Sequence, residues 1–551
     1  MNQPRSPRAT AALRVLVPLL CLGLAALGCG GRSPTWSAPV GSAQAIGLTN
    51  AVVLVDLPAH RAVALGVDPS GALAETALPT GHGVVATAVG PKGGRLYVLS
   101  AGHQGGLGDP QAEEAPRLTI IDGTTTPATS HDIPLDVLSD PLDGLAIDPT
   151  EHWAVVYAAS GTGTAFVTNP NELVIVDLTG AKPPQPVVLH SFGGHPERLI
   201  FAPPLTLPAG LTHLLVVQSD QDFTLLALDD PTKPDITVRL ADATAVTRPH
   251  PAEVVFDDGD PVMTDDARIG VRFDAQTSVM TLQLEPAAGP SGYAPTINVA
   301  DVGGVPSAIA FVRTDGGLRL SALVPGRSAA VLVDPATTTT SVVALPAGYR
   351  SLSLVTAPAV ASAGAAAGPD LALLWNGTTP LAGVAFWELG RASGLPFRSI
   401  ETVGINGVVT DVRDVAGQND ALKVLSTSGG TATGGAFFVL DLGARTATPL
   451  LTATPDVTLS VSPTGARVWA FQVGGLGLAS TELPSGRVHS LTVDTPASAL
   501  FEITRADGGQ SLVVLHEGVG VGATVFDADK PNEAGRRIYG ALLTEGSYDD
   551  Q

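Results

Sequence analysis

The feature that most constrains the fold is a short apolar run that ends in an acidic residue and recurs along most of the chain. The run AVVLVD is typical of the set, because its β-branched residues favour a strand over a helix. Successive runs are roughly 40 to 65 residues apart, a spacing that indicates an array of similar supersecondary units. The acids that end the runs are Asp56, Asp122, Asp177, Asp229, Glu285, Asp334, Glu388, Asp441, Glu482 and Asp527.

A second pattern occupies a fixed place in each unit. Segments such as HPERLIF (195–201) and HPAEVVF (250–256) place a proline just before a strand, where no ladder N–H is needed. A glycine-containing turn and a strong strand follow, as in PKGGRLYVL (91–99) and PTGARVWAF (463–471). Each unit therefore predicts strand, turn, strand, loop, strand ending in an acid, turn and strand. This order describes a four-stranded antiparallel blade, and its radial repetition gives a β-propeller.

The repeats resemble those of YVTN/YncE-like and lactonase-like propellers, which share this spacing of proline, glycine turn and strand ending in Asp. The resemblance implies an all-β propeller over residues 51–551, and we expect one ring of seven to nine blades. Nine units have all the elements, whereas the unit containing Asp56 has no clear first half. We expect the strand at 51–56 to close the ring by pairing with the C-terminal unit. Since this fold carries many unrelated activities, the resemblance names no function.

The N-terminus has the composition of a signal peptide. Arg5, Arg8 and Arg14 precede an apolar run from Val15 to Leu27, which is too short to span a bilayer. Small residues then lead to Cys29, and this arrangement resembles the lipobox of bacterial lipoproteins. The resemblance implies cleavage before Cys29, acylation of that residue, and a division into a signal peptide (1–28), a lipid-anchored tether (29–50) and the propeller (51–551). Gly30 after the cysteine implies the outer membrane.

Charge and cysteine content limit the function classes. The formal charge of −22 becomes −25 once the three arginines of residues 1–28 are removed, since that segment holds no acid. Such a chain does not suit nucleic acid, which requires clustered Lys and Arg. Cys21 would be lost with the signal and Cys29 would carry lipid, so thiol catalysis and cysteine-ligated metals are excluded. The expected partners are the membrane, through the lipid, and an envelope protein or polysaccharide.

The recurrent aspartates have a structural interpretation. A carboxylate at a strand end can accept the N–H groups of the following turn, as in an Asx-turn. We expect this role for Asp56, Asp122, Asp177, Asp229, Asp334, Asp441 and Asp527. The alternative, a ring of aspartate ligands, would require these separate turns to converge.

Three histidines suggest a candidate site. His82, His195 and His250 each precede the first strand of a unit, and Asp143 holds the equivalent place between the first two of them. First strands line the centre of a propeller, so these side chains are expected near one mouth of its channel. Imidazoles and a carboxylate there could hold a divalent metal or position a base. The alternative is that they are solvated loop residues, and no HxH or HExxH motif supports a metal site.

Two functions remain open from the sequence. The favoured one is a noncatalytic envelope lipoprotein whose propeller binds a protein, peptide or polysaccharide, with no cofactor. The alternative is a propeller enzyme, lactonase-like or a metal-assisted hydrolase, with its site at the channel mouth. The chain has neither a G-x-S-x-G nucleophile elbow nor a Walker A sequence, which favours the binding protein.

Overall fold

A computed structural model describes residues 43–539, apart from several internal segments. The segments not described are 104–112, 137–141, 160–168, 194, 204–212, 241–249, 258–266, 315–316, 356–370, 380–382, 390–399, 406, 418–420, 429–435, 453–456, 517–520 and 532. The expected signal peptide and Cys29 lie outside the described residues. Among the residues that are described, no helix is long and apolar enough to cross a membrane.

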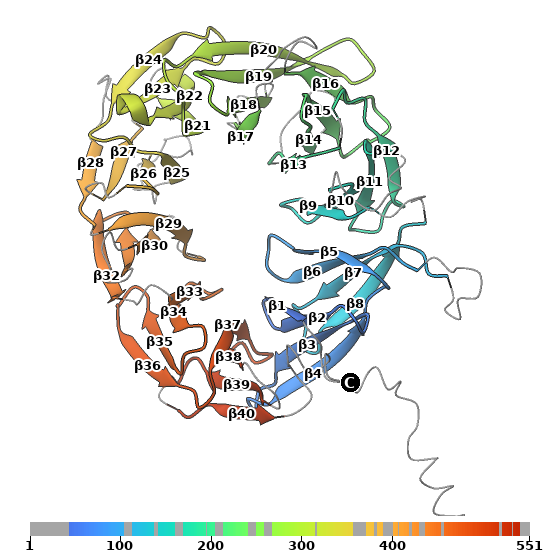
Figure 1. The fold of residues 1–551 in the computed structure, drawn as a ribbon, viewed down its shortest axis with the longest axis vertical. Helices are drawn as coiled ribbons and strands as arrows, with labels where there is room; N and C mark the ends of the chain where they lie inside the picture. Colours follow the sequence, from blue (N-terminus) through green and yellow to red (C-terminus); the bar gives the residue numbers. More distant parts are fainter. Residues whose placement is uncertain are drawn as a thin grey trace, which may run out of the picture.

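The described chain forms ten antiparallel sheets of four strands each, arranged as blades around a ring (Figure 1). Blade 1 holds β1 (Ala43–Gly47), β2 (Val52–Asp56), β3 (Arg61–Val67) and β4 (Leu73–Pro79). Blade 2 holds β5 (Val84–Val89), β6 (Arg95–Ser100), β7 (Arg117–Asp122) and β8 (Thr129–Pro134). Blade 3 holds β9 (Gly144–Ile147), β10 (Trp153–Tyr157), β11 (Glu172–Asp177) and β12 (Gln185–Val188). Blade 4 holds β13 (Arg198–Phe201), β14 (Leu214–Gln218), β15 (Asp222–Ala227) and β16 (Ile236–Arg239).

The next three blades follow the same order. Blade 5 holds β17 (Pro251–Phe256), β18 (Ala267–Phe273), β19 (Ser278–Pro286) and β20 (Tyr293–Asp301). Blade 6 holds β21 (Ala308–Thr314), β22 (Gly317–Val324), a 3₁₀ turn (Pro325–Arg327), β23 (Ala329–Val333) and β24 (Thr340–Ala344). Blade 7 holds β25 (Ser351–Val355), β26 (Leu371–Trp375), β27 (Val384–Glu388) and β28 (Ile400–Val403).

The last three blades complete the ring. Blade 8 holds β29 (Val408–Asp414), β30 (Leu422–Ser428), β31 (Ala436–Asp441) and β32 (Thr446–Thr452). Blade 9 holds β33 (Val457–Val461), β34 (Arg467–Gln472), β35 (Gly477–Glu482) and β36 (Val488–Thr492). Blade 10 holds β37 (Ala497–Thr504), β38 (Gln510–His516), β39 (Val521–Asp527) and β40 (Arg536–Tyr539).

The predicted four-stranded antiparallel propeller is therefore confirmed, but the expected seven to nine blades were too few. In each sheet the strands pair in chain order, with the first strand toward the centre of the ring and the fourth at its rim (Figure 1). Second and third strands are buried on both faces by the neighbouring blades, as the fully buried β2 and β3 illustrate. This two-sided burial explains why the sequence shows continuous apolar runs instead of an alternating pattern.

Ten clusters of buried apolar side chains hold the ring together, and each cluster joins two neighbouring blades. The ring closes where blade 10 meets blade 1: Val52 and Leu54 pack with Val513 and Val525. The expected closure by a spare N-terminal strand is wrong. The segment 52–56 is β2, which pairs with β1 and β3 inside blade 1. Blade 1 begins at Ala43, inside the segment expected to be a tether.

The two faces of the ring carry different connections. On one face each first strand begins and the second strand connects to the third; we call it the start face. The other face carries the turns between first and second strands and between third and fourth strands; we call it the turn face. Because every blade has the same strand order, residues at equivalent places in different blades lie on the same face. This rule places the candidate residues below.

Candidate functional site

The histidines predicted at the channel mouth lie on the start face, but they contact different groups. The His250 ring contacts two carboxylates, with Nε2 at 3.0 Å from Glu197 of blade 4 and Nδ1 at 3.4 Å from Asp274 of blade 5. His195 lies half-buried just before Glu197. Asp143 accepts the N–H of Ala159 at 2.7 Å. Of the four positions, His250 thus contacts Glu197 directly, whereas His195 is related to that glutamate by its place two residues earlier in the chain.

His82 belongs to a different group of side chains at the junction of blades 1 and 2. Its ring pairs with Glu114, and its centroid lies 4.2 Å from that of His60 and 6.0 Å from that of His103. Glu114 also pairs with Arg117. Among the described residues, no three His, Cys, Asp or Glu side chains are placed to hold one metal ion.

Sequence reasoning missed His60 and His103. His60 occupies the turn between β2 and β3 with φ of 51°, and His103 follows β6. No shared motif links either residue to His82, because only the contact between two blades brings them together. Burial, followed by the neighbouring His82, lowers the pKa of His60 below its usual 6.5.

The recurrent aspartates lie mostly at turns on the turn face. Their carboxylates accept turn N–H groups two or three residues later in the pairs Asp122–Thr124, Asp177–Thr179, Asp334–Ala336, Asp441–Ala444 and Asp527–Asp529. Asp229 instead accepts the N–H of His213 at 2.7 Å. These acids are therefore distributed around the ring, one to a blade.

Asp56 differs from the rest of this set. It ends the second strand of blade 1, whereas the other acids lie at the end of a third strand. Its carboxylate pairs with Arg61 at 3.0 Å, and both side chains are almost fully buried. Ala59 N–H is 3.4 Å from the same carboxylate. In blade 1 the acid equivalent to the others is Asp68, which accepts the N–H groups of Ser70 and Ala72.

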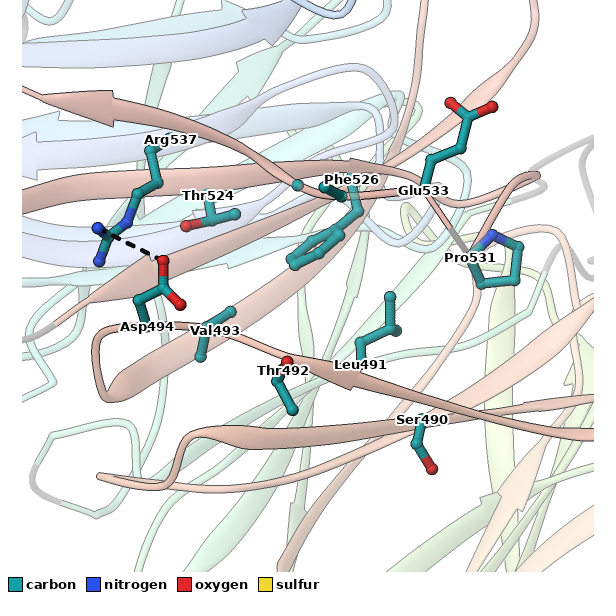
Figure 2. Close-up of a pocket in the computed structure, with 12 residues that line it drawn as sticks. Ser490, Leu491, Thr492, Val493, Asp494, Thr524, Phe526, Pro531, Glu533 and Arg537 are labelled. Atoms are coloured by element: carbon teal, nitrogen blue, oxygen red, sulfur yellow. Dashed lines mark ion pairs between the residues drawn. The ribbon is translucent and has the colours of Figure 1, made fainter.

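A groove lies between the outer parts of blades 9 and 10 (Figure 2). Its volume is about 470 Å³, within the range of ligand sites. The apolar part comprises Leu491, Val493, Phe526 and Pro531, of which the first three are buried. The remaining lining residues are Ser490, Thr492, Asp494, Thr524, Glu533, Ala534, Gly535 and Arg537.

The two ends of the groove are charged (Figure 2). At one end Arg537 lies 3.5 Å from Asp494, whose side chain remains 80% exposed. Arg537 also donates to the Thr495 hydroxyl at 2.6 Å. At the other end Glu533 stands beside Pro531, and it is exposed. The groove therefore has a carboxylate at each end, one of which is paired with an arginine.

The wall of the groove is fixed by a buried histidine. His516 Nε2 lies 2.7 Å from the hydroxyl of Thr524, and Nδ1 lies 3.2 Å from the carbonyl of Pro496. Burial is the main cause that lowers the pKa of His516. A neutral ring donates to the carbonyl through Nδ1 and accepts the Thr524 hydroxyl at Nε2. The hydrogen bonds thus tie the groove wall to the segment that links the two blades.

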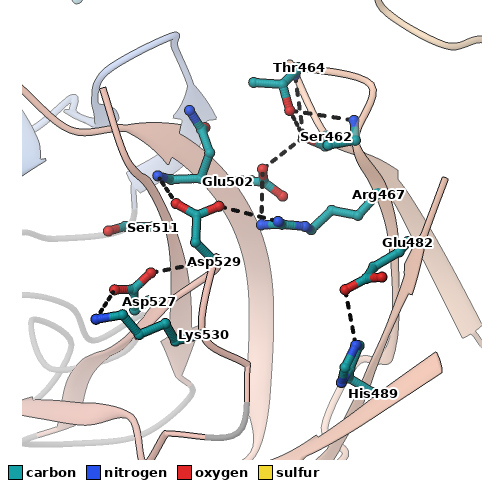
Figure 3. Close-up of polar contacts among 12 residues, drawn as sticks. Ser462, Thr464, Arg467, Glu482, His489, Glu502, Ser511, Asp527, Asp529 and Lys530 are labelled. Carbon is teal, nitrogen blue, oxygen red and sulfur yellow. Dashed lines mark hydrogen bonds and ion pairs between the residues drawn. The ribbon is translucent and has the colours of Figure 1, made fainter. Parts of the chain in front are cut away.

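Glu502, on the first strand of blade 10, forms polar contacts across the same junction (Figure 3). This carboxylate from β37 is 1% exposed and accepts hydrogen bonds from Ser462 at 2.7 Å and from the Trp469 ring N–H. Arg467 lies 3.8 Å from Glu502 and also pairs with Asp529. Burial outweighs these stabilising contacts and raises the pKa of Glu502. The network joins β34 and the turn after β33 in blade 9 to β37 and the turn after β39 in blade 10.

The fold defines the class of this protein as a ten-bladed β-propeller within the described residues. No family model matches the sequence, and no curated protein matches it. Solved structures do align: a dihydro-heme d1 dehydrogenase, NirN, matches at 11% identity with a TM-score of 0.37, covering 82% of this chain and 74% of its own. A eukaryotic initiation factor matches at 11% identity with a TM-score of 0.43, covering 78% of this chain and 94% of its own.

The Dos1 propeller also aligns, at 13% identity with a TM-score of 0.37, covering 74% of this chain and 94% of its own. At such identities and scores these likenesses carry no argument about activity. The assignment of the fold rests on the pairing of the strands themselves.

Proposed function

We propose that this protein is a lipid-anchored, noncatalytic binding protein of the bacterial cell envelope, whose propeller holds a peptide segment of a partner in the groove between blades 9 and 10. The observation that carries the proposal is the groove itself, whose lining is mainly polar and has charged side chains at both ends. Such a surface can form hydrogen bonds with the backbone and the polar side chains of a partner.

The topology of the groove favours a peptide over a polysaccharide. Five consecutive residues, 490–494, line one side, and β36 is the last strand of its sheet. An outermost strand has one edge of backbone N–H and C=O groups directed away from its sheet, and an extended peptide can pair with that edge.

The lipid anchor is supported by the sequence, where small residues lead to Cys29 directly after the apolar run. We expect the Cys29→Ser variant to lose incorporation of labelled palmitate and to move from the membrane to the soluble fraction. The matched control is Cys21→Ser, which lies inside the apolar run and should keep both properties. Unchanged labelling of Cys29→Ser would refute the anchor.

Binding is tested with the mature Cys29→Ser protein and an unbiased library of displayed peptides. A tryptophan at Ala534, an exposed residue of the groove, should abolish binding of the selected peptides by filling the space. Ala336→Trp is the control, because Ala336 is exposed in the equivalent turn of blade 6. The proposal fails if no peptide is selected, if both variants weaken binding equally, or if Ala534→Trp blocks an envelope polysaccharide instead.

A further inference from the structure

The point where the chain enters the ring and the exposed apolar side chains favour the same face of the molecule. We infer that the start face lies against the lipid membrane and that its exposed apolar side chains meet the lipid at the level of the headgroups. This inference rests on the lipid anchor proposed above, and it adds the orientation of the ring and the surface that contacts the membrane.

The chain enters the ring on the start face. Blade 1 begins with β1 at Ala43, and first strands begin on this face. Thirteen residues, 30–42, separate Ala43 from Cys29, and a chain of that length spans at most about 50 Å. To reach a membrane on the other side, it would first have to pass the height of the ring, about 20 Å for a strand of six residues. The start face can meet the membrane without that detour.

Large apolar side chains are exposed at many places on the start face. The connections between second and third strands expose Leu57, Val473 and Leu476, and the beginning of β5 exposes Val85. The end of β12 and the links that lead to β13 and β21 expose three more, which are Val188, Phe192 and Val305. Such side chains lose their contact with water when a partner covers the face.

The turn face exposes fewer large apolar side chains. Among the described residues, Val89 and Val488 are the exposed members of this kind on the turn face, and Ile297, Val299 and Val342 lie within outer strands. The apolar side chains of the start face come from blades spread around the ring (Figure 1). A surface that meets all of them must be as wide as the ring. The membrane that holds Cys29 is such a surface.

Phe192 illustrates the chemistry of this contact. Its side chain is 54% exposed, and the guanidinium of Arg239, at the end of β16, lies 4.3 Å from the centre of its ring. The N–H of Phe192 donates to the buried carboxylate of Asp222, which fixes this residue at the surface. An aromatic ring beside an exposed cation suits the boundary between acyl chains and headgroups, where the ring contacts hydrocarbon and the cation contacts phosphate.

The test uses single cysteines, because Cys29 carries the lipid and an introduced cysteine is then the only free thiol of the mature chain. Phe192→Cys and Leu476→Cys label the start face, and Val488→Cys is the matched control, an exposed apolar position on the turn face. Each purified, lipidated variant is labelled with nitrobenzoxadiazole and reconstituted at low density into phosphatidylcholine vesicles with or without nitroxide-labelled lipid. The labels at 192 and 476 should lose most of their fluorescence to the nitroxide, whereas the label at 488 should keep it.

The inference is overturned if the nitroxide quenches the label at 488 as much as the labels at 192 and 476. It is also overturned if the labels at 192 and 476 are shielded from aqueous iodide but not quenched by the lipid, because a second copy of the chain would then cover the face. Palmitate incorporation is measured on the same samples. If Cys29 is acylated and either result appears, the anchor stands and only the orientation fails; if Cys29 is not acylated, the anchor itself fails and the orientation with it.

Discussion

Two junctions of the ring bury ionisable side chains of opposite kinds. Between blades 1 and 2, His60 packs against His82 near Glu114, and burial lowers its pKa. Between blades 9 and 10, Glu502 accepts hydrogen bonds from Ser462 and Trp469, and burial raises its pKa. In both places burial disfavours the charged form. A rise in pH therefore destabilises the junction of blades 9 and 10, and a fall in pH destabilises the junction of blades 1 and 2.

The comparison also separates two ways of holding blades together. The junction of blades 9 and 10 places Trp469, which is fully buried, directly on the Glu502 carboxylate. The junction of blades 1 and 2 places half-buried imidazoles on the start face, beside the buried pair of Asp56 and Arg61. We therefore expect packing to contribute most of the stability at the junction of blades 9 and 10, and charge pairing to be more important at the junction of blades 1 and 2.

The largest effect is expected at Trp469. Trp469→Ala should lower the free energy of unfolding by about 3 to 5 kcal/mol, because it opens a cavity and removes a donor from Glu502. Urea unfolding followed by circular dichroism measures the change. Trp469→Phe keeps most of the packing and should lose about 1 to 3 kcal/mol. A loss below about 1 kcal/mol for Trp469→Ala would mean that this junction does not depend on its packing.

The next effect separates Asp56 from the other recurrent aspartates. Asp56→Ala leaves Arg61 buried without its carboxylate and should cost about 3 kcal/mol. Asp334→Ala removes the acceptor of two turn N–H groups at a more exposed position and should cost about 1 kcal/mol. The same unfolding experiment compares the two variants. Equal costs would show that Asp56 acts as an ordinary turn acid.

Asp56 also shows where prediction from sequence ends. The blade architecture was predictable because second and third strands are buried on both faces, which leaves continuous apolar runs such as ELVIVD at Asp177. AVVLVD at Asp56 looks the same, yet it is a second strand, since β1 precedes it. The segment AQAIG of β1 has neither the proline nor the glycine turn of the other units. Strand position depends on pairing, which local sequence does not encode.

The blade number and the groove were unpredictable for a related reason. A correct blade count requires that β1 be recognised as a strand, and its sequence lacks the pattern of the other first strands. The groove combines residues 490–494 with Thr524, Phe526 and Arg537, which come from two blades and share no motif. The same holds for His60, whose ring reaches His82 only across a junction. The predictions for Cys29, the signal peptide and a metal near His195 and His250 stay predictions.

At the junction of blades 9 and 10, the protonation of Glu502 should make the stability of the fold depend on pH. Its pKa lies above the ordinary 4.5 in the folded chain, so the folded state binds the proton more tightly than the unfolded state. The contribution of Glu502 to stability is therefore full below pH 4.5 and is lost as pH rises through the raised pKa. Glu502→Gln resembles the protonated side chain and should flatten this decline, measured as the urea midpoint against pH.

The control for Glu502 is Glu75→Gln, which replaces an exposed carboxylate on an outer strand. This variant should leave the slope of midpoint against pH as it is in the parent. If Glu502→Gln also keeps the parent slope, the decline comes from other acids. The next to test is Glu253, which is half-buried at the junction of blades 5 and 6 and whose pKa is also raised, mainly by burial.

The smallest effect is expected at His60, and it has the opposite sign. Burial and His82 lower the pKa of His60, while Glu114 and Asp56 act against them, so its contribution to stability is present above pH 6.5 and is lost as pH falls through the lowered pKa. His60→Asn suits the positive φ of 51° and removes the titrating ring. Its midpoint should therefore decline less than that of the parent between pH 7 and pH 5. The midpoint of the control variant His131→Asn, at an exposed position on β8, should decline as that of the parent does.

Glu502→Gln acts on the opposite limb of the pH profile. A double variant with His60→Asn should therefore flatten both limbs additively, because the two junctions share no residues.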